Sequence, residues 1–193
     1  MWASVQVKTA GALPLDAADL RGRLRIDTAA EDTLLQDFLA AAASRIEGPD
    51  GVGIALMAQT WTLTIDAWAG EITLPGWPVT GVSEIRYLDA DGATQALDHA
   101  AAFRLVAGTD PVRLVRKPGA ALPATLGGRS VIEIDYTLGR ADASAVDPGL
   151  VTAMALLAGH YYENREATVP AQVKELPMGV EHILARFTRG VVA

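Results

Sequence analysis

The sequence predicts an α+β protein in which N- and C-terminal helices form a small helical bundle that carries an inserted antiparallel β-sheet domain. Apolar residues recur at helical spacing in the first and last parts of the chain, and between them apolar and polar residues alternate with a period of two. The predicted boundaries are residues 1–50 for the N-terminal helices, 51–140 for the β insertion and 141–193 for the C-terminal helices and a tail. Neither helical block can bury its apolar stripe alone, so the two blocks are expected to pack together.

The N-terminal block contains two predicted helices. The first is short, begins near Asp16 and carries Leu20 and Leu24 on one face. The second is expected to open with Thr28 and Glu31, which match the capping-box pattern. Its apolar stripe consists of Leu35, Phe38, Leu39, Ala42 and Ile46. The residues of the segment 47–51, EGPDG, then end the helix.

The middle block predicts five or six short strands. In the segment 59–66, Trp61, Leu63 and Ile65 share one face and threonines take the other, which indicates a half-buried antiparallel strand. The segment 89–92, DADG, is typical of a hairpin turn. The other predicted strands are 71–74, 82–87, 112–115 and 131–136.

The last block returns to helical spacing. Asp147 is a suitable N-cap, and Pro148 fits the first helical turn, where its missing N–H costs nothing. The long helix that follows, 148–164, has a stripe of Leu150, Met154, Leu157 and Tyr161. A final short amphipathic helix is expected over 180–187.

Composition excludes several classes of protein. The chain has no cysteine, so it holds neither disulfides nor thiolate metal sites, and no apolar run approaches the ~20 residues of a membrane span. His99, His160 and His182 lack the spacing of a metal site, and no nucleophile elbow or phosphate-binding loop is present. We therefore expect no catalytic residue, no cofactor, no metal and no membrane contact. The N-terminus lacks the features of a signal peptide, which favours synthesis in a reducing cytosol.

Three tryptophans leave a second interpretation open. Trp61, Trp68 and Trp77 are spaced to fill a small β core, but aromatic side chains also stack on sugars. The alternative function is a carbohydrate- or peptide-binding β module on a helical base.

Six phrases, in order, carry a resemblance to a known family. They are LRID with EDTLL at 24–35, QTWTLTID at 59–66, IRYLDADG at 85–92, IDYTLG at 134–139, HYYENRE at 160–166 and LPMGVE at 176–181. With them the chain resembles the head–tail connector (adaptor, or head-completion) proteins of long-tailed phages and of gene transfer agents, from about Leu13 to Phe187. The resemblance does not separate the phage version from the gene transfer agent version.

The resemblance implies a structural role at the head–tail junction of a virion or phage-like particle. Such proteins form a ring, commonly of twelve copies, beneath the portal protein, and they extend the DNA channel toward a tail-side stopper or tail terminator protein. It also implies that the C-terminal end docks into the portal. The docking residues would be Arg186, Phe187, Thr188, Arg189, Val191 and Val192, a segment with basic and apolar side chains and no acidic ones.

The net charge suits a protein around DNA that does not grip it. The formal charge is −7, and no basic patch stands out in the sequence. An acidic channel would repel phosphates and let DNA pass without sequence-specific binding. The ring stoichiometry, the oligomeric state in isolation, the face that meets portal or tail and the orientation of the β insertion all stay open.

Overall fold

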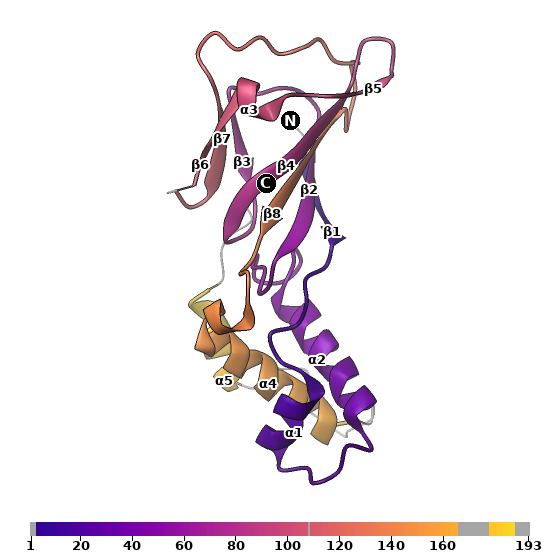
Figure 1. The fold of residues 1–193 in the computed structure, drawn as a ribbon, viewed down its shortest axis with the longest axis vertical. Helices are drawn as coiled ribbons and strands as arrows, with labels where there is room; N and C mark the ends of the chain where they lie inside the picture. Colours follow the sequence, from indigo (N-terminus) through magenta and orange to yellow (C-terminus); the bar gives the residue numbers. More distant parts are fainter. Residues whose placement is uncertain (1–2, 108, 166–177, 188–193) are drawn as a thin grey trace. The chain divides into compact units, whose positions relative to one another are not determined.

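The computed structural model describes residues 3–107, 109–165 and 178–187 of the chain (Figure 1). Among these, residues 3–11 and 58–139 form one compact unit, called here the β unit. Residues 12–57 and the described part of 140–187 form the other, called the helical unit. The predicted α+β class, with helices from both ends of the chain and antiparallel sheets from its middle, is confirmed.

The β unit contains a five-stranded antiparallel sheet. Its strands, in spatial order, are β1 (Ala3–Thr9), β2 (Gln59–Ile65), β8 (Ile132–Leu138), β4 (Val79–Leu88) and β5 (Thr94–Ala96). The predicted turn at 89–92 joins β4 to β5, and the Asp89 carboxylate accepts hydrogen bonds from the backbone N–H groups of Asp91 and Ala93. These bonds belong to a hairpin turn, as predicted.

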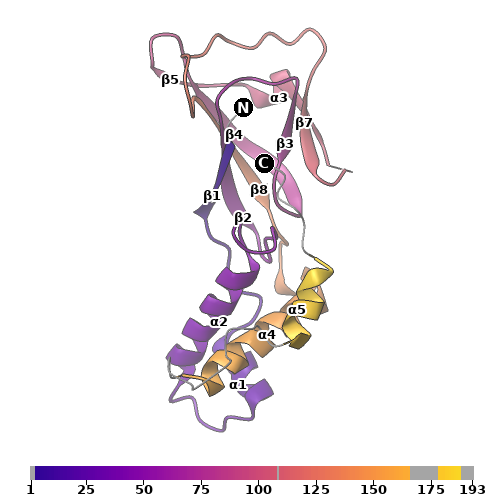
Figure 2. The same cartoon turned by 180° about the vertical axis from the view of Figure 1, so that it is seen from behind.

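A three-stranded antiparallel sheet completes the β unit (Figures 1 and 2). Its strands, in spatial order, are β3 (Glu71–Leu74), β7 (Val112–Arg116) and β6 (Phe103–Val106), with the one-turn helix α3 (His99–Ala102) directly before β6. The ring of Trp68 contacts Tyr87 of β4 and Phe103 of β6, at centroid distances of 5.8 and 6.2 Å. Trp68 therefore bridges the two sheets.

The apolar core of the β unit is centred on Trp61 and Tyr136. Both side chains are fully buried, and their rings meet edge to face at 6.4 Å. The Tyr136 hydroxyl donates to the Pro75 carbonyl at 2.9 Å, and the next residue, Gly76, has φ +87°. A Cβ at Gly76 would lie 2.6 Å from Trp61 Cζ3, so the chain needs glycine here for both conformation and space.

The opposite face of the five-stranded sheet is polar and holds one buried carboxylate. Asp135 on β8 is 2% exposed and pairs with Lys8 and Arg86 from β1 and β4. Thr62 of β2 also donates to it at 2.6 Å. Burial opposes ionisation of Asp135, but the bonds from Lys8 and Thr62 and the charge of Arg86 outweigh it and lower its pKa. The carboxylate thus connects four adjacent strands on this face.

The helical unit consists of α1 (Ala17–Leu24), α2 (Asp32–Ile46), α4 (Pro148–Glu163) and α5 (Met178–Ala185), with a 3₁₀ turn at Ala143–Ala145. Helix α4 is the central element, since it packs against α1, α2 and α5. Its core includes Leu20, Leu35, Leu39, Ile46, Met154 and Leu157, all fully buried. As predicted, Asp147 caps α4 by accepting from the Gly149 N–H at 2.7 Å, and Pro148 is its first residue. Within the described chain no helix is long and apolar enough to cross a membrane.

Three local predictions were wrong or incomplete. The boundary at residue 50 placed the whole N-terminal segment with the helices, but β1 pairs with β2 along its length. The capping box occurs in α1, between Asp16 and Asp19, and not at Thr28. Helix α2 begins only at Asp32, and the Glu31 carboxylate bonds to Tyr162, in the last turn of α4, and to Arg165, just after it, instead of capping. Strands β5 and β6 were also missed.

Candidate functional site

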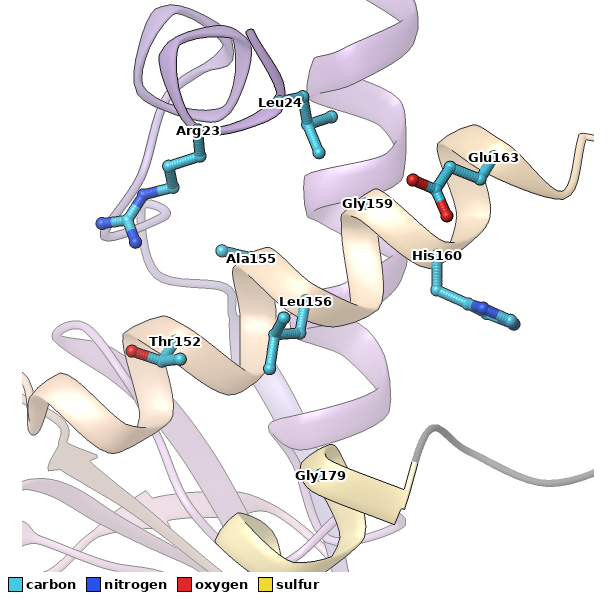
Figure 3. Close-up of a pocket in the computed structure, with 9 residues that line it drawn as sticks. All are labelled: Arg23, Leu24, Thr152, Ala155, Leu156, Gly159, His160, Glu163 and Gly179. Carbon is cyan, nitrogen blue, oxygen red and sulfur yellow. The ribbon is translucent and has the colours of Figure 1, made fainter.

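A groove of about 510 Å³ lies along α4 on the surface of the helical unit (Figure 3). Helix α1 forms one wall with Arg23 and Leu24, and Gly179 of α5 lies at the other side. The floor comes from consecutive turns of α4. These α4 residues are Thr152, Ala155, Leu156, Gly159, His160 and Glu163.

Leu156 gives the groove an apolar side chain that is accessible to solvent. Its side chain is 49% exposed, whereas Leu157, one residue on, is fully buried in the core. Leu156 is thus one of the few large apolar side chains that the described residues leave exposed. A single exposed leucine is ordinary, but one on the floor of a concave surface is typical of a contact site.

Gly159 lets α1 approach α4 closely. A Cβ at this position would lie 3.1 Å from Leu24 Cδ2, tighter than ordinary van der Waals contact. The small residues Ala155 and Gly159 therefore set the depth of the groove, and Leu156 stands beside them (Figure 3).

The groove carries opposite charges at its two ends. In Figure 3, Arg23 extends from α1 over the end that holds Thr152 and Ala155, and Glu163 lies at the other end beside His160. Within the described parts of the chain neither Arg23 nor Glu163 forms an ion pair. His160 is engaged by Asn164, one turn later on the chain, at 3.2 Å.

A polar cluster holds the C-terminal end of α4 against the start of α2. Two nitrogens of the Arg165 guanidinium donate to the Glu31 carboxylate at 2.8 and 2.9 Å, and the Tyr162 hydroxyl donates to it at 2.6 Å. The bonds from Arg165, and then the bond from Tyr162, hold the pKa of Glu31 at about 2. Phe38 contacts the rings of Tyr161 and Tyr162 from α2. The phrase HYYENRE is thus largely structural: it fixes the helix that carries the groove.

The structure describes only two of the six predicted docking residues. Arg186 is exposed, with its guanidinium 6.0 Å from the centroid of the Phe187 ring. Phe187 is half-buried and packs against the core of the helical unit, where its Cε2 atom lies 3.6 Å from a Cβ placed on Gly149. The remaining four, Thr188, Arg189, Val191 and Val192, lie outside the described residues.

The described residues gather no metal-binding cluster. No group of three or more His, Asp or Glu side chains among them is arranged to hold a metal ion. Trp61 is buried, with its indole N–H donating to Gln59, and that of Trp68 donates to the Pro123 carbonyl. The roles of these two tryptophans are core packing and sheet bridging, and the third, Trp77, is half-buried.

Sequence reasoning missed the groove, although one signal was present. Leu156 lies off the stripe Leu150, Met154, Leu157 and Tyr161, and a large apolar residue off the buried face of a helix has no core to enter. The neighbouring wall from α1 could not be inferred, because the sequence does not show which helices pack against that side of α4.

Solved structures of gene transfer agent (GTA) particles contain chains similar to this one over its whole length. A chain in the neck of an empty GTA particle, computed with C6 symmetry, is 34% identical, with a TM-score of 0.75 and coverage of 100% of this chain and 98% of that chain. A chain in the neck of a native GTA particle, computed with C12 symmetry, is 33% identical, with a TM-score of 0.75 and coverage of 98% and 97%. The virion of a native GTA particle contains one that is 34% identical, with a TM-score of 0.74 and the same coverage.

The chain belongs to the head–tail connector family. No family model matches it, and no curated protein sequence does either. The assignment therefore depends on full-length structural likeness at an identity of about one third, together with the six phrases in family order. The groove and the other exposed faces of the helical unit are candidate contact surfaces, since the similar chains are parts of particle necks.

Proposed function

We propose that this connector is the head–tail adaptor of a gene transfer agent or related phage-like particle, where it forms a ring beneath the portal and extends the DNA channel toward the tail. The observation that carries the proposal is the likeness to neck chains over 98% or more of the sequence. The C6 and C12 symmetries of those necks support a ring, with twelve copies as the proposed number. The adaptor acts as a structural part and not as an enzyme.

The partners follow from the position in the neck. On one side the ring contacts the portal protein, and on the other a tail-side stopper or tail terminator protein. The DNA passes through without sequence-specific contacts, and the formal charge of −7 supports weak interaction between the ring and phosphates. The particle neck is the proposed site of action, after synthesis in the bacterial cytoplasm.

The C-terminal segment is the proposed portal-docking element. Residues 186–193 carry Arg186 and Arg189 and no acidic side chain, and they add the apolar Val191 and Val192. Phe187 has a second role, because its ring already packs against the helical core. Docking is therefore assigned chiefly to the residues that follow it.

A truncation separates docking from folding. A chain that ends at Phe187 keeps the aromatic side chain that packs against the helical core. We therefore expect its melting temperature to match that of the wild type. When it is mixed with purified portal rings, sedimentation should show loss of the complex that the full chain forms. Undiminished binding by the truncated chain would refute the docking assignment. A full-length chain that stays monomeric and ignores portal rings would refute the adaptor role itself.

The alternative, a carbohydrate- or peptide-binding β module, has no observation in its favour. It drew on Trp61, Trp68 and Trp77, and of these Trp61 and Trp68 serve the core and the contact between sheets. Binding of the purified chain to a glycan array would revive it.

A further inference from the structure

The outer face of α2 has the shape and charge to fit the groove along α4. Helix α2 turns Leu35, Leu39 and Ile46 toward the core, and its opposite face is exposed. That exposed face is formed mainly by Asp37, Ala40, Ala41, Ser44 and Arg45. The two alanines place short side chains in the middle of the face, with an acidic residue before them and a basic residue after them.

The groove and this face lie on opposite sides of the helical unit. In Figure 3, α2 passes behind α4, and the residues that line the groove lie in front of α4. A subunit of a ring must present two different surfaces to its two neighbours, because head-to-tail contacts close the ring. One unit with a concave surface on one side and a flat helix face on the other meets this requirement.

The charges of the two surfaces are complementary in sign, and they occur in the same order along the two helices. Along α2, Asp37 and Arg45 are eight residues apart, or about 12 Å at 1.5 Å per residue. Along α4, Ala155 and Glu163 are also eight residues apart, and Arg23 extends over the end of the groove that contains Ala155 (Figure 3). Asp37 can therefore meet Arg23 while Arg45 meets Glu163, with the two helices running in the same direction.

The apolar residues match in the same register. With Asp37 near Ala155, the Leu156 side chain lies over the space between Asp37, Ala40 and Ala41. Residues at these spacings surround one hole on a helix surface, and a leucine is the usual knob for such a hole. The contact would bury the side chain that is 49% exposed in the single chain.

We propose that the groove binds the outer face of α2 from a second copy of this chain, so that this contact, repeated head to tail, closes the adaptor ring. The inference rests on the proposed ring function and adds the surfaces that build it. The occupant is another copy, because the complementary surface lies on the chain itself, and the neck chains that it resembles come from assemblies with C6 and C12 symmetry.

Disulfide trapping in assembled particles tests this contact. The natural chain has no cysteine, so a variant with Leu156→Cys and Ala40→Cys introduces the only thiols. A disulfide needs Cα atoms within about 7 Å, and the two positions lie on opposite sides of one subunit, so only neighbouring copies can join. Particles are purified from cells in which the only gene for this protein carries both changes. They are then oxidised and run on a non-reducing gel. We expect a ladder that extends beyond the dimer to the full ring.

The two single-cysteine variants are matched controls. Each should stay monomeric, because a head-to-tail contact brings Leu156 against Ala40 and never against another Leu156. A strong dimer from either single variant would overturn the head-to-tail contact. Particles that contain the double variant but give no ladder would overturn the groove contact and leave the adaptor role intact. Absence of the wild-type chain from purified particles would instead overturn the adaptor role.

A second variant makes the test independent of oxidation. Leu156→Asp changes an exposed side chain, so its melting temperature should equal that of the wild type. Burying the new charge at the contact should lower its incorporation into particles at least about tenfold. Leu156→Met, which keeps the volume and the apolar character, should incorporate normally. Normal incorporation of the aspartate variant would overturn the proposal.

Discussion

Tyr162 donates its hydroxyl hydrogen to Glu31 across 131 positions of sequence, with an oxygen–oxygen distance of 2.6 Å. The Arg165 guanidinium pairs with the same carboxylate and lies 4.2 Å from the centroid of the Tyr162 ring. These contacts join the end of α4 to the residue that precedes α2. They therefore fix the helix that forms the groove relative to the helix whose outer face is proposed to enter the next groove.

Stability should depend on pH through Glu31. Hydrogen bonds from Arg165 and then Tyr162 lower its pKa from 4.5 to about 2 in the native state. A depressed native pKa stabilises the fold fully above the unfolded value, and the effect is lost as the pH falls through the native one. We expect Glu31→Gln to melt below the wild type at neutral pH, with the gap closing between about pH 4.5 and 2. Circular dichroism melts across this range measure it.

Glu163→Gln is the control for that series. Glu163 also lies near the end of α4 but has no ion pair among the described residues. Its melting curve should follow that of the wild type at each pH. A difference between Glu31→Gln and wild type that is the same at neutral pH and near pH 2 would contradict the pKa argument.

Leu157→Asp should unfold the helical unit. Leu157 is fully buried, and a carboxylate there has no partner, so we expect a loss of more than about 4 kcal/mol. The neighbouring Leu156→Asp is the matched control, with the same chemical change at an exposed site. Denaturant unfolding of the two variants should differ sharply. Equal stability would mean that the face of α4 is assigned wrongly.

Gly76→Ala should destabilise the β unit by about 3 kcal/mol or more, since it adds backbone strain to an overlap with the core. The new Cβ would lie 2.6 Å from Trp61 and 2.8 Å from Leu138. Gly92 also has a positive φ, of +82°, but open space around it, so Gly92→Ala should cost only about 1–2 kcal/mol. Tryptophan fluorescence during urea unfolding gives both values. Similar losses of stability for Gly76→Ala and Gly92→Ala would show that the structure shifts to relieve the overlap with Trp61.

Asp135→Asn should weaken the polar face of the five-stranded sheet. It removes the ion pairs with Lys8 and Arg86 in a place that is 2% exposed, and we expect a loss of about 1–3 kcal/mol at neutral pH. Glu133→Gln, two residues earlier on the same strand and face, changes a side chain that is 48% exposed, and it should have little effect. Chemical unfolding at neutral pH compares the two. A larger loss from Glu133→Gln would contradict the central place of Asp135.

The spacing of apolar residues and the residues typical of helix ends were enough to predict the long helices and strands. Asp147 and Pro148 marked the start of α4, and the alternation through Trp61 marked β2, because one face of each is buried in a core. Strand β1 was missed although Ala3, Val5 and Val7 alternate with polar residues, because it lies far in sequence from the other strands and next to the predicted helices. The short β5 has three residues, all exposed, and so gives no pattern to detect.

The candidate site was predictable only in part. Thr28 and Glu31 satisfied a capping pattern, but Glu31 is bonded by Arg165, which lies 134 positions later, and local sequence does not contain such a partner. The groove likewise depends on Gly159 meeting Leu24, a contact between distant helices. Family likeness supplied the role of the protein; it did not supply these contacts.

The order of segments in the chain also constrains how the protein folds as it is synthesised. The chain starts in the β unit, enters the helical unit for residues 12–57, returns to the β unit, and leaves it after residue 139. All described residues of the β unit therefore precede α4 in synthesis. Until α4 leaves the ribosome, Leu20, Leu35 and Leu39 of α1 and α2 lack the helix against which they pack in the native structure. The nascent chain thus exposes an apolar surface while the sheet is synthesised. At this stage a chaperone would protect the nascent chain from aggregation.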